Sequence, residues 1–257
     1  MSYETILYEK RGALVDITLN RPERLNAMNF QLGHELTQAI TEIEADQEIR
    51  VVVIHGAGRS FCAGADIKTM AEGDSPADLG RILTAVNNRV EALNCITIAA
   101  VHGYATGGGC ELALACDLRL AATGAYFGLP EVKLGLLPGA GGTQRLPRII
   151  GVGRAKMVMY MGDFIDAETA LQWGLVNQVA PEEKLLEEAT KLAQTLQARP
   201  PLAVRFIKSC IDVGGQMDLR SGLEYEGRCV QILAASEDAK EGTSAFAEKR
   251  EPNFKGR

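Results

Sequence analysis

The pattern of apolar and polar positions changes once along the chain, near residue 195. Before that point, short apolar runs that suit buried strands alternate with segments of helical spacing; after it only helical spacing remains. The clearest strand candidates are residues 51–54 and 96–101, and each ends in a His-Gly pair. The pattern predicts an α/β core over residues 1–195 and a helical segment over residues 196–257.

Weaker patterns predict the other strands and helices of the core. Residues 4–20 hold two strand-like runs with a turn at Arg11-Gly12, which predicts a hairpin. Asp166 is a candidate N-cap for a helix that ends near Gly174. The other predicted elements are a helix containing Leu32, Leu36, Ile40 and Ile43, strands at residues 117–122 and 176–179, a helix from Gly142 toward Ile150, and a helix whose apolar stripe is Leu185, Ala189, Leu192 and Leu196.

The composition limits the classes of protein to which the chain can belong. A chain of 257 residues with 46% hydrophobic content can bury a sizeable core. The net charge is -6, and Lys and Arg are scattered rather than massed, which argues against a nucleic-acid surface. The start lacks a signal-peptide pattern, and no apolar run reaches about 18 residues, so we expect no membrane segment and a cytoplasmic location.

Cysteine spacing gives no sign of a metal site or a disulfide framework. The six cysteines include no CxxC pair, as expected for reduced thiols of an intracellular protein. Cys110 and Cys116 lie six apart on a predicted helix and cannot share a face. We therefore predict that the protein binds no metal.

Two glycine-containing loops could hold a ligand. Gly107-Gly108-Gly109 separates a buried strand from a helix whose first N–H groups have no intrahelical acceptor, and residues 58–66 follow the strand at 51–54 in the same way. Ligands bind at the carboxyl ends of parallel strands, so one donor from each loop could form an oxyanion hole. Either loop alone would equally suit a simple connection.

Two glutamates are candidates for acid–base chemistry. Glu111 lies in the first turn of an apolar helix, and Glu131 follows Pro130 in the apolar stretch YFGLPEVKLGLLPG. A carboxylate at a helix start is often only stabilising. A buried Glu, however, is rare without a partner or a function, and two glutamates that converge on one water would supply a general acid and a general base.

At these residues the sequence resembles the crotonase (enoyl-CoA hydratase/isomerase) family. The resemblance implies an α/β crotonase-like fold of repeated strand-strand-helix units with a C-terminal helical trimerisation segment. The matching stretches, in the family's order, are LNRPERLNAMN, SFCAGADIK, IAAVHGYATGGGCELALACDLRLAA, FGLPEVKLGLLPGAGGTQRLPRIIG and SAFAEKREPNFK.

The resemblance also implies roles for particular residues. The N–H groups of Ala65 and Gly108 would hold the thioester oxygen, and Lys249 would approach the phosphates of coenzyme A (CoA) bound to a neighbouring subunit. The other positions implied to bind CoA and substrate are Arg24, Leu25, Ala63, Asp66, Ile67 and Lys68. Ala65 and Gly108 belong to the same set.

The chain resembles the hydratase branch of the family because it has both acids. Glu111 would activate water and Glu131 would protonate C2 of a 2-enoyl-CoA, giving a 3-hydroxyacyl-CoA in acyl-CoA degradation. Leu129 is a departure, because some hydratases have Gln there, and this bears on the hydrogen bonding around Glu131. Two alternatives remain open: a 3-enoyl-CoA isomerase or other acyl-CoA lyase on the same fold, and, more remotely, an RNA-binding relative.

The expected partners follow from the same resemblance. We expect a homohexamer built as two trimers, an acyl-CoA substrate, and no cofactor beyond the CoA that the substrate carries. Acyl-chain preference would depend on the variable region around residues 69–95, from which no preference can be predicted.

Overall fold

The computed structural model describes residues 3–71, 73 and 75–257. Two compact units make up the chain, Met1–Ala193 and Gln194–Arg257. The predicted division after residue 195 falls two residues beyond this boundary.

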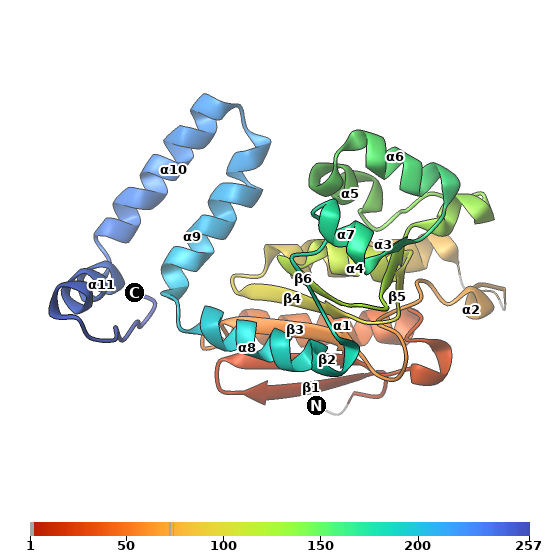
Figure 1. The fold of residues 1–257 in the computed structure, drawn as a ribbon, viewed down its shortest axis with the longest axis horizontal. Helices are drawn as coiled ribbons and strands as arrows, with labels where there is room; N and C mark the ends of the chain where they lie inside the picture. The colour runs from red at the N-terminus through yellow and green to blue at the C-terminus, as the bar shows by residue number, and fades with distance from the viewer. Residues whose placement is uncertain (1–2, 72, 74) are drawn as a thin grey trace. The chain divides into compact units, whose positions relative to one another are not determined.

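A six-stranded sheet forms the framework of the first unit (Figure 1). Its order is β1-β2-β3-β4-β6-β9. The strands are β1 (Ile6–Arg11), β2 (Leu14–Leu19), β3 (Val51–Gly56), β4 (Ile96–Val101), β6 (Leu118–Ala122) and β9 (Gln178–Ala180). β1 and β2 form the predicted antiparallel hairpin, and every later pair is parallel. The carboxyl ends of β3 and β4 therefore lie side by side, as predicted.

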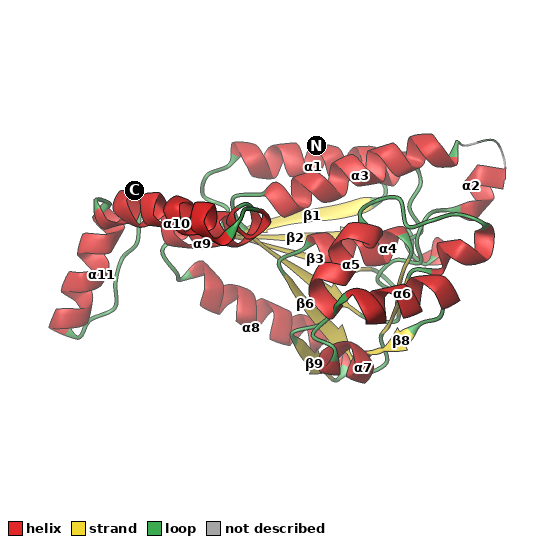
Figure 2. Cartoon of the chain, turned by 90° about the horizontal axis from the view of Figure 1, so that it is seen from above, coloured by secondary structure: helices red, strands yellow, loops and turns green. Residues whose placement is uncertain are grey.

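Helices cover both faces of this sheet. In Figure 2, α1 (Phe30–Ala45) and α3 (Pro76–Ala92) lie along one face and α8 (Leu185–Gln197) along the other. Every residue of β4 is buried, which explains its unbroken apolar run. The predicted apolar stripe of α1 is buried, and the Asn29 carboxamide caps this helix by accepting from Leu32 N at 3.0 Å.

A second, three-stranded sheet was not predicted from the sequence. It consists of β5 (Tyr104–Thr106), β7 (Tyr126–Gly128) and β8 (Ile165–Asp166). Strands of two or three residues are too short to show an alternation of apolar and polar positions. The sheet matters for the site because it leads directly into Gly107, whose N–H donates to Gly128 O at 2.9 Å.

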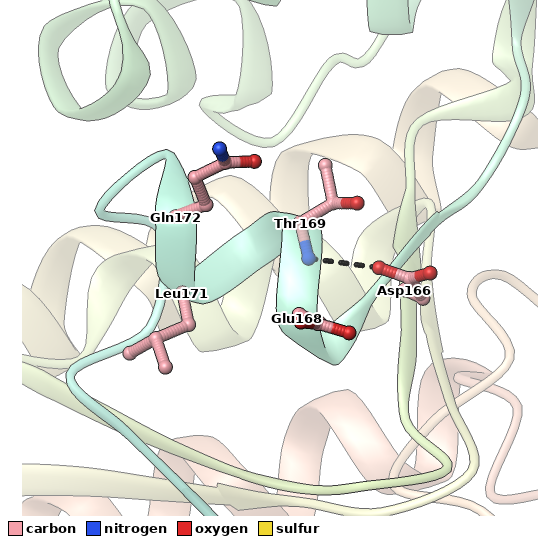
Figure 3. Close-up of a pocket in the computed structure, with 5 residues that line it drawn as sticks. All are labelled: Asp166, Glu168, Thr169, Leu171 and Gln172. Atoms are coloured by element: carbon pink, nitrogen blue, oxygen red, sulfur yellow. Dashed lines mark hydrogen bonds between the residues drawn. The ribbon is translucent and has the colours of Figure 1, made fainter.

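Short helices complete the first unit. They are η1 (Pro22–Arg24), α2 (Ile67–Ala71), α4 (Gly108–Ala115), η2 (Pro130–Leu134), α5 (Gly142–Ile150), α6 (Val152–Met161), α7 (Ala167–Gln172) and η3 (Glu182–Lys184). The predicted N-cap is confirmed: the Asp166 carboxylate accepts from Thr169 N at 2.8 Å, in the shallow pocket beside α7 (Figure 3). One oxygen of this carboxylate therefore serves the start of α7.

The described residues of the second unit form helices and no strand, as the sequence predicted, and residues 251–257 follow the last helix without regular structure. After the end of α8 it contains α9 (Pro201–Asp212), η4 (Gly214–Gln216), α10 (Leu219–Ala234) and α11 (Glu237–Glu248). Ser209 and Tyr225 join α9 to α10 through a hydroxyl pair at 2.6 Å. Among the described residues, no helix is long and apolar enough to cross a membrane.

Candidate active site

The site is built where the loops that follow β3 and β4 meet. Cys62, in the loop after β3, pairs with Ala105 of β5, and its N–H donates to Tyr104 O at 2.9 Å. Thr106 N in turn donates a hydrogen bond to Cys62 O at 3.0 Å. The loop after β3 is thus held against the segment that leads into α4, and both predicted ligand loops face one another.

Ala65 and Gly108 bring two backbone N–H groups close together. A Cβ built on Gly108 would lie 3.9 Å from Ala65 N. Gly108 is the first residue of α4, so its N–H has no intrahelical acceptor. Met28 fixes the backbone on both sides of Ala65, because it donates to Gly64 O at 2.7 Å and accepts from Asp66 N at 2.8 Å. Two fixed donors at such a spacing can hold one carbonyl oxygen.

Two glycines of the run of three, Gly107 and Gly109, are required by the backbone around them. Gly107 adopts a left-handed φ of +52°, which disfavours a side chain. A Cβ at Gly109 would lie 2.3 Å from Cys62 O, so only glycine lets α4 approach the loop after β3. The glycines thus place the start of α4 beside Ala65.

Glu111 is a buried carboxylate held by a distant loop. The residue is 2% exposed, and its Oε1 accepts from Ala140 N at 2.7 Å and from Gly142 N at 2.8 Å. Burial raises the pKa of Glu111, and the two N–H donors and the charge of Arg145 oppose that rise. The donors favour the ionised form, which is the form a general base needs.

Glu131 lies near the start of η2 in a different environment. Its Oε2 is buried and finds no hydrogen-bond partner among the described residues. A Cβ on Gly107 would lie 3.2 Å from Glu131 Oε1, so this carboxyl group lies against the start of α4. The pKa of Glu131 is raised to about 7, chiefly by burial and to a smaller extent by the nearby charge of Glu111.

Together these groups support proton transfer next to a polarised carbonyl. Glu111 has two donors that stabilise its charge, whereas the pKa of Glu131, raised to about 7, leaves this group partly protonated near neutral pH. Two titratable groups whose environments separate their proton affinities are suited to act as base and acid. Among the described residues, no group of three or more His, Cys, Asp or Glu side chains could hold a metal ion.

Most residues predicted to bind CoA lie on two adjoining segments of the first unit. Leu25 O accepts from Ala63 N at 3.0 Å, which joins the end of η1 to the loop after β3. Arg24, Ile67 and Lys68 are exposed and available to a ligand. Lys249 belongs to the second unit, where it ends α11 with φ +55°, and its predicted contact with CoA stays a prediction.

Asp66 has an internal role that the sequence did not suggest. Its carboxylate is buried, pairs with Arg21 Nη2 at 2.9 Å and accepts from Lys68 N at 3.3 Å. The Arg21 guanidinium also donates to Ala27 O. Asp66 therefore uses its side chain to stabilise the loop, and its predicted contact with CoA stays a prediction.

Sequence reasoning also missed the groups that hold Glu111. The stretch PGAGGTQ was interpreted only as the approach to a helix, and the N–H groups of Ala140 and Gly142 were not singled out. The apolar environment of Glu111 was the available signal, because a buried carboxylate demands donors. Of the region around residues 69–95, positions 72 and 74 lie outside the described residues.

Comparisons with known proteins agree with this geometry. Residues 9–257 match the family model described as enoyl-CoA hydratase/isomerase. The chain is 42% identical to the crotonyl-CoA hydratase of Syntrophomonas wolfei, with 99% of each chain covered, and 44% identical to the 2,3-dehydroadipyl-CoA hydratase of Escherichia coli, with 98% and 99% covered. A crystal structure of enoyl-CoA hydratase from Bacillus anthracis superposes with a TM-score of 0.96 at 42% identity, covering 99% of this chain and 100% of that one. The chain therefore belongs to the enoyl-CoA hydratase/isomerase family and has the crotonase fold.

Replacement of Gly108 tests the pair of N–H donors. Gly108→Ala should place a methyl group where the substrate oxygen would lie between Gly108 and Ala65, and turnover of a 2-enoyl-CoA should fall by about two decades, about 3 kcal/mol. The tightest contact of the new methyl would be the end of the Leu83 side chain at 3.2 Å, so the protein should fold. Steady-state kinetics should be compared with Gly153→Ala in α6, where a Cβ meets nothing within 4 Å. Equal turnover in the two folded variants would place the oxyanion hole elsewhere.

Proposed function

We propose that this chain adds water across the 2,3 double bond of a 2-enoyl-CoA to give a 3-hydroxyacyl-CoA. One observation carries the proposal: two buried glutamates with separated proton affinities lie beside two backbone N–H donors. The hydratase names of the S. wolfei and E. coli relatives support the same reaction. The chain is an enzyme of the hydro-lyase class.

The proposed reaction begins with the thioester oxygen. Donors at Ala65 and Gly108 bind this oxygen, on which negative charge grows as water attacks C3 and an enolate forms. Glu111 accepts a proton from the attacking water, and Glu131 gives its proton to C2. One turnover leaves Glu111 protonated and Glu131 ionised, so a proton must pass between them or through solvent before the next cycle.

The substrate supplies the remaining chemistry. The thioester already acidifies the position next to its carbonyl, so the proposed reaction needs no metal and no cofactor beyond the CoA moiety. We assign CoA binding to Arg24, Leu25, Ala63, Asp66, Ile67 and Lys68, with Ala65 and Gly108 contributing backbone N–H groups. The net charge of -6 argues against RNA as a ligand. Six free cysteines suit a reducing compartment, and a cytoplasmic location is part of the proposal.

We also propose a hexamer of two trimers. The second unit leaves large apolar side chains exposed on its helices, and these need a cover. Examples are Ile207 at 59%, Leu219 at 79% and Phe246 at 88% exposure. Light scattering at micromolar concentration should give about six times the protomer mass of 27.7 kDa. A mass equal to one protomer would contradict the assembly, and Lys249 could then not reach the CoA of a neighbouring subunit.

Glutamine replacements test the two acids. Glutamine keeps the shape of glutamate and can accept the bonds from Ala140 and Gly142, but it cannot exchange a proton at neutral pH. Glu111→Gln and Glu131→Gln should each bind acyl-CoA normally and lose about two to four decades of crotonyl-CoA hydration. The double variant should be only slightly worse than the poorer single one.

Thermal melting of the same three variants separates catalysis from helix capping. If the glutamates only stabilised helix starts, the variants would lose about 1 kcal/mol of stability and keep near-normal turnover. Isomerisation of a 3-enoyl-CoA should be measured beside hydration. A Glu131→Gln enzyme that retained most of its hydratase rate would remove the main reason for preferring hydratase over isomerase.

The dependence of hydration on pH follows from Glu131. This group must be protonated to donate to C2, and its pKa is raised to about 7. The kcat/KM for hydration should therefore be retained below pH 7 and fall by about tenfold per pH unit well above it. Because the charge of Glu111 raises the pKa of Glu131, Glu111→Gln should move this alkaline limb to lower pH. A wild-type profile that stays flat to pH 9 would exclude Glu131 as the acid.

A further inference from the structure

The carboxylate of Glu111 is oriented by a loop that needs its own support. Ala140 N and Gly142 N bind Glu111 Oε1, and both belong to the turn at residues 139–142 that precedes α5. Glycine occupies three of these four positions, so the turn has few side chains to fix it. Side chains of α3 instead bind two of its carbonyl oxygens, those of Gly139 and Ala140.

Asn87 supplies the most buried of these contacts. It is 1% exposed, and its Nδ2 donates to Ala140 O at 3.0 Å. Arg145 Nη1 reaches the same oxygen at 3.3 Å, while the rest of its guanidinium pairs with Glu91 of α3 at 2.7 Å. A buried amide whose donor is aimed at one backbone oxygen fixes that residue of the turn.

Thr84 acts on the neighbouring peptide group. Its Oγ1 lies 3.0 Å from Gly139 O and 2.8 Å from Gly80 O, so one hydroxyl proton is shared between two carbonyls. The Gly139 carbonyl and the Ala140 N–H belong to the same planar peptide unit. A donor at that oxygen therefore aligns and polarises the N–H that holds Glu111.

We propose that Thr84 and Asn87 are positioning residues for Glu111, acting through the peptide groups at residues 139–142. The proposal rests on the proposed role of Glu111 as the general base. It adds that α3 sets the orientation and the charge state of that base from a distance. The same helix also carries Leu83, which lies against Gly108, so α3 borders both the base and the oxyanion hole.

Loss of these supports should affect the chemical step more than binding. The segments proposed to bind CoA, residues 24–25 and 63–68, make none of the contacts described for Thr84 and Asn87. KM should therefore change little while kcat falls. Weaker donors at Ala140 and Gly142 stabilise the ionised form of Glu111 less, so its pKa should rise. The acid limb of kcat/KM, the fall in rate as Glu111 takes up a proton, should therefore move to higher pH.

Threonine variants provide the matched test. Thr84→Val removes only the hydroxyl and should lower kcat about three- to tenfold, with the acid limb moved upward, while Thr84→Ser should restore both. Thr37→Val is the control: Thr37 is also half-buried on a helix, and its hydroxyl bonds the carbonyl four residues back, Gly33 O, at 2.8 Å. Asn87→Leu should lower kcat by about tenfold or more.

Hydration of crotonyl-CoA should be measured across pH for all five proteins together with thermal melting. A lower kcat with an unchanged KM and a displaced acid limb in Thr84→Val, absent in Thr37→Val, supports the proposal even if Asn87→Leu does not fold. Thr84→Val kinetics equal to those of Thr37→Val would overturn it. A wild-type protein without hydratase activity would instead overturn the proposed function, so the two failures are distinguishable.

Discussion

The structure around the site depends on keeping a carboxylate charged in an apolar interior. Glu111 lies in α4, a helix whose eight residues are all buried. Burial without hydrogen bonds would force this group to take up a proton. Two N–H groups from residues 139–142 oppose this by stabilising the ionised form, and side chains of α3 bind the same residues. Gly109 and Gly142 follow from the same constraint, since Gly109 lets α4 approach the Cys62 carbonyl and Gly142 lets its backbone approach the Glu111 carboxylate.

The contrast between the two glutamates arises from their hydrogen bonds rather than from burial alone. Burial raises the pKa of both Glu111 and Glu131. Glu111 has two backbone donors on one oxygen, whereas Oε2 of Glu131 has no partner in the described part of the chain. The ionised form of Glu111 also raises the proton affinity of its neighbour. One arrangement therefore provides both a base and an acid at neutral pH.

Long apolar runs and helical spacing were sufficient to predict the large sheet and the helices against it. β3 and β4 agree with the sequence because runs of successive residues in each are buried, and α1 agrees because its buried residues recur at helical spacing. The small sheet could not be predicted, since β8 has two residues and its pairing joins distant segments. The two glutamates stood out as charges in apolar stretches. The donors to Glu111 did not, because backbone N–H groups carry no sequence signal, and the pairing of Asp66 with Arg21 spans 45 positions.

The central claim is that the two buried carboxyl groups differ in proton affinity because of their surroundings. Infrared difference spectroscopy across pH follows the protonated carboxyl stretch directly in protein labelled with ¹³C-glutamate. The account predicts one buried carboxyl group that titrates near pH 7, vanishes in Glu131→Gln and moves to lower pH in Glu111→Gln. Titration of every glutamate near the ordinary value of about 4.3, with no signal lost in Glu131→Gln, would contradict it.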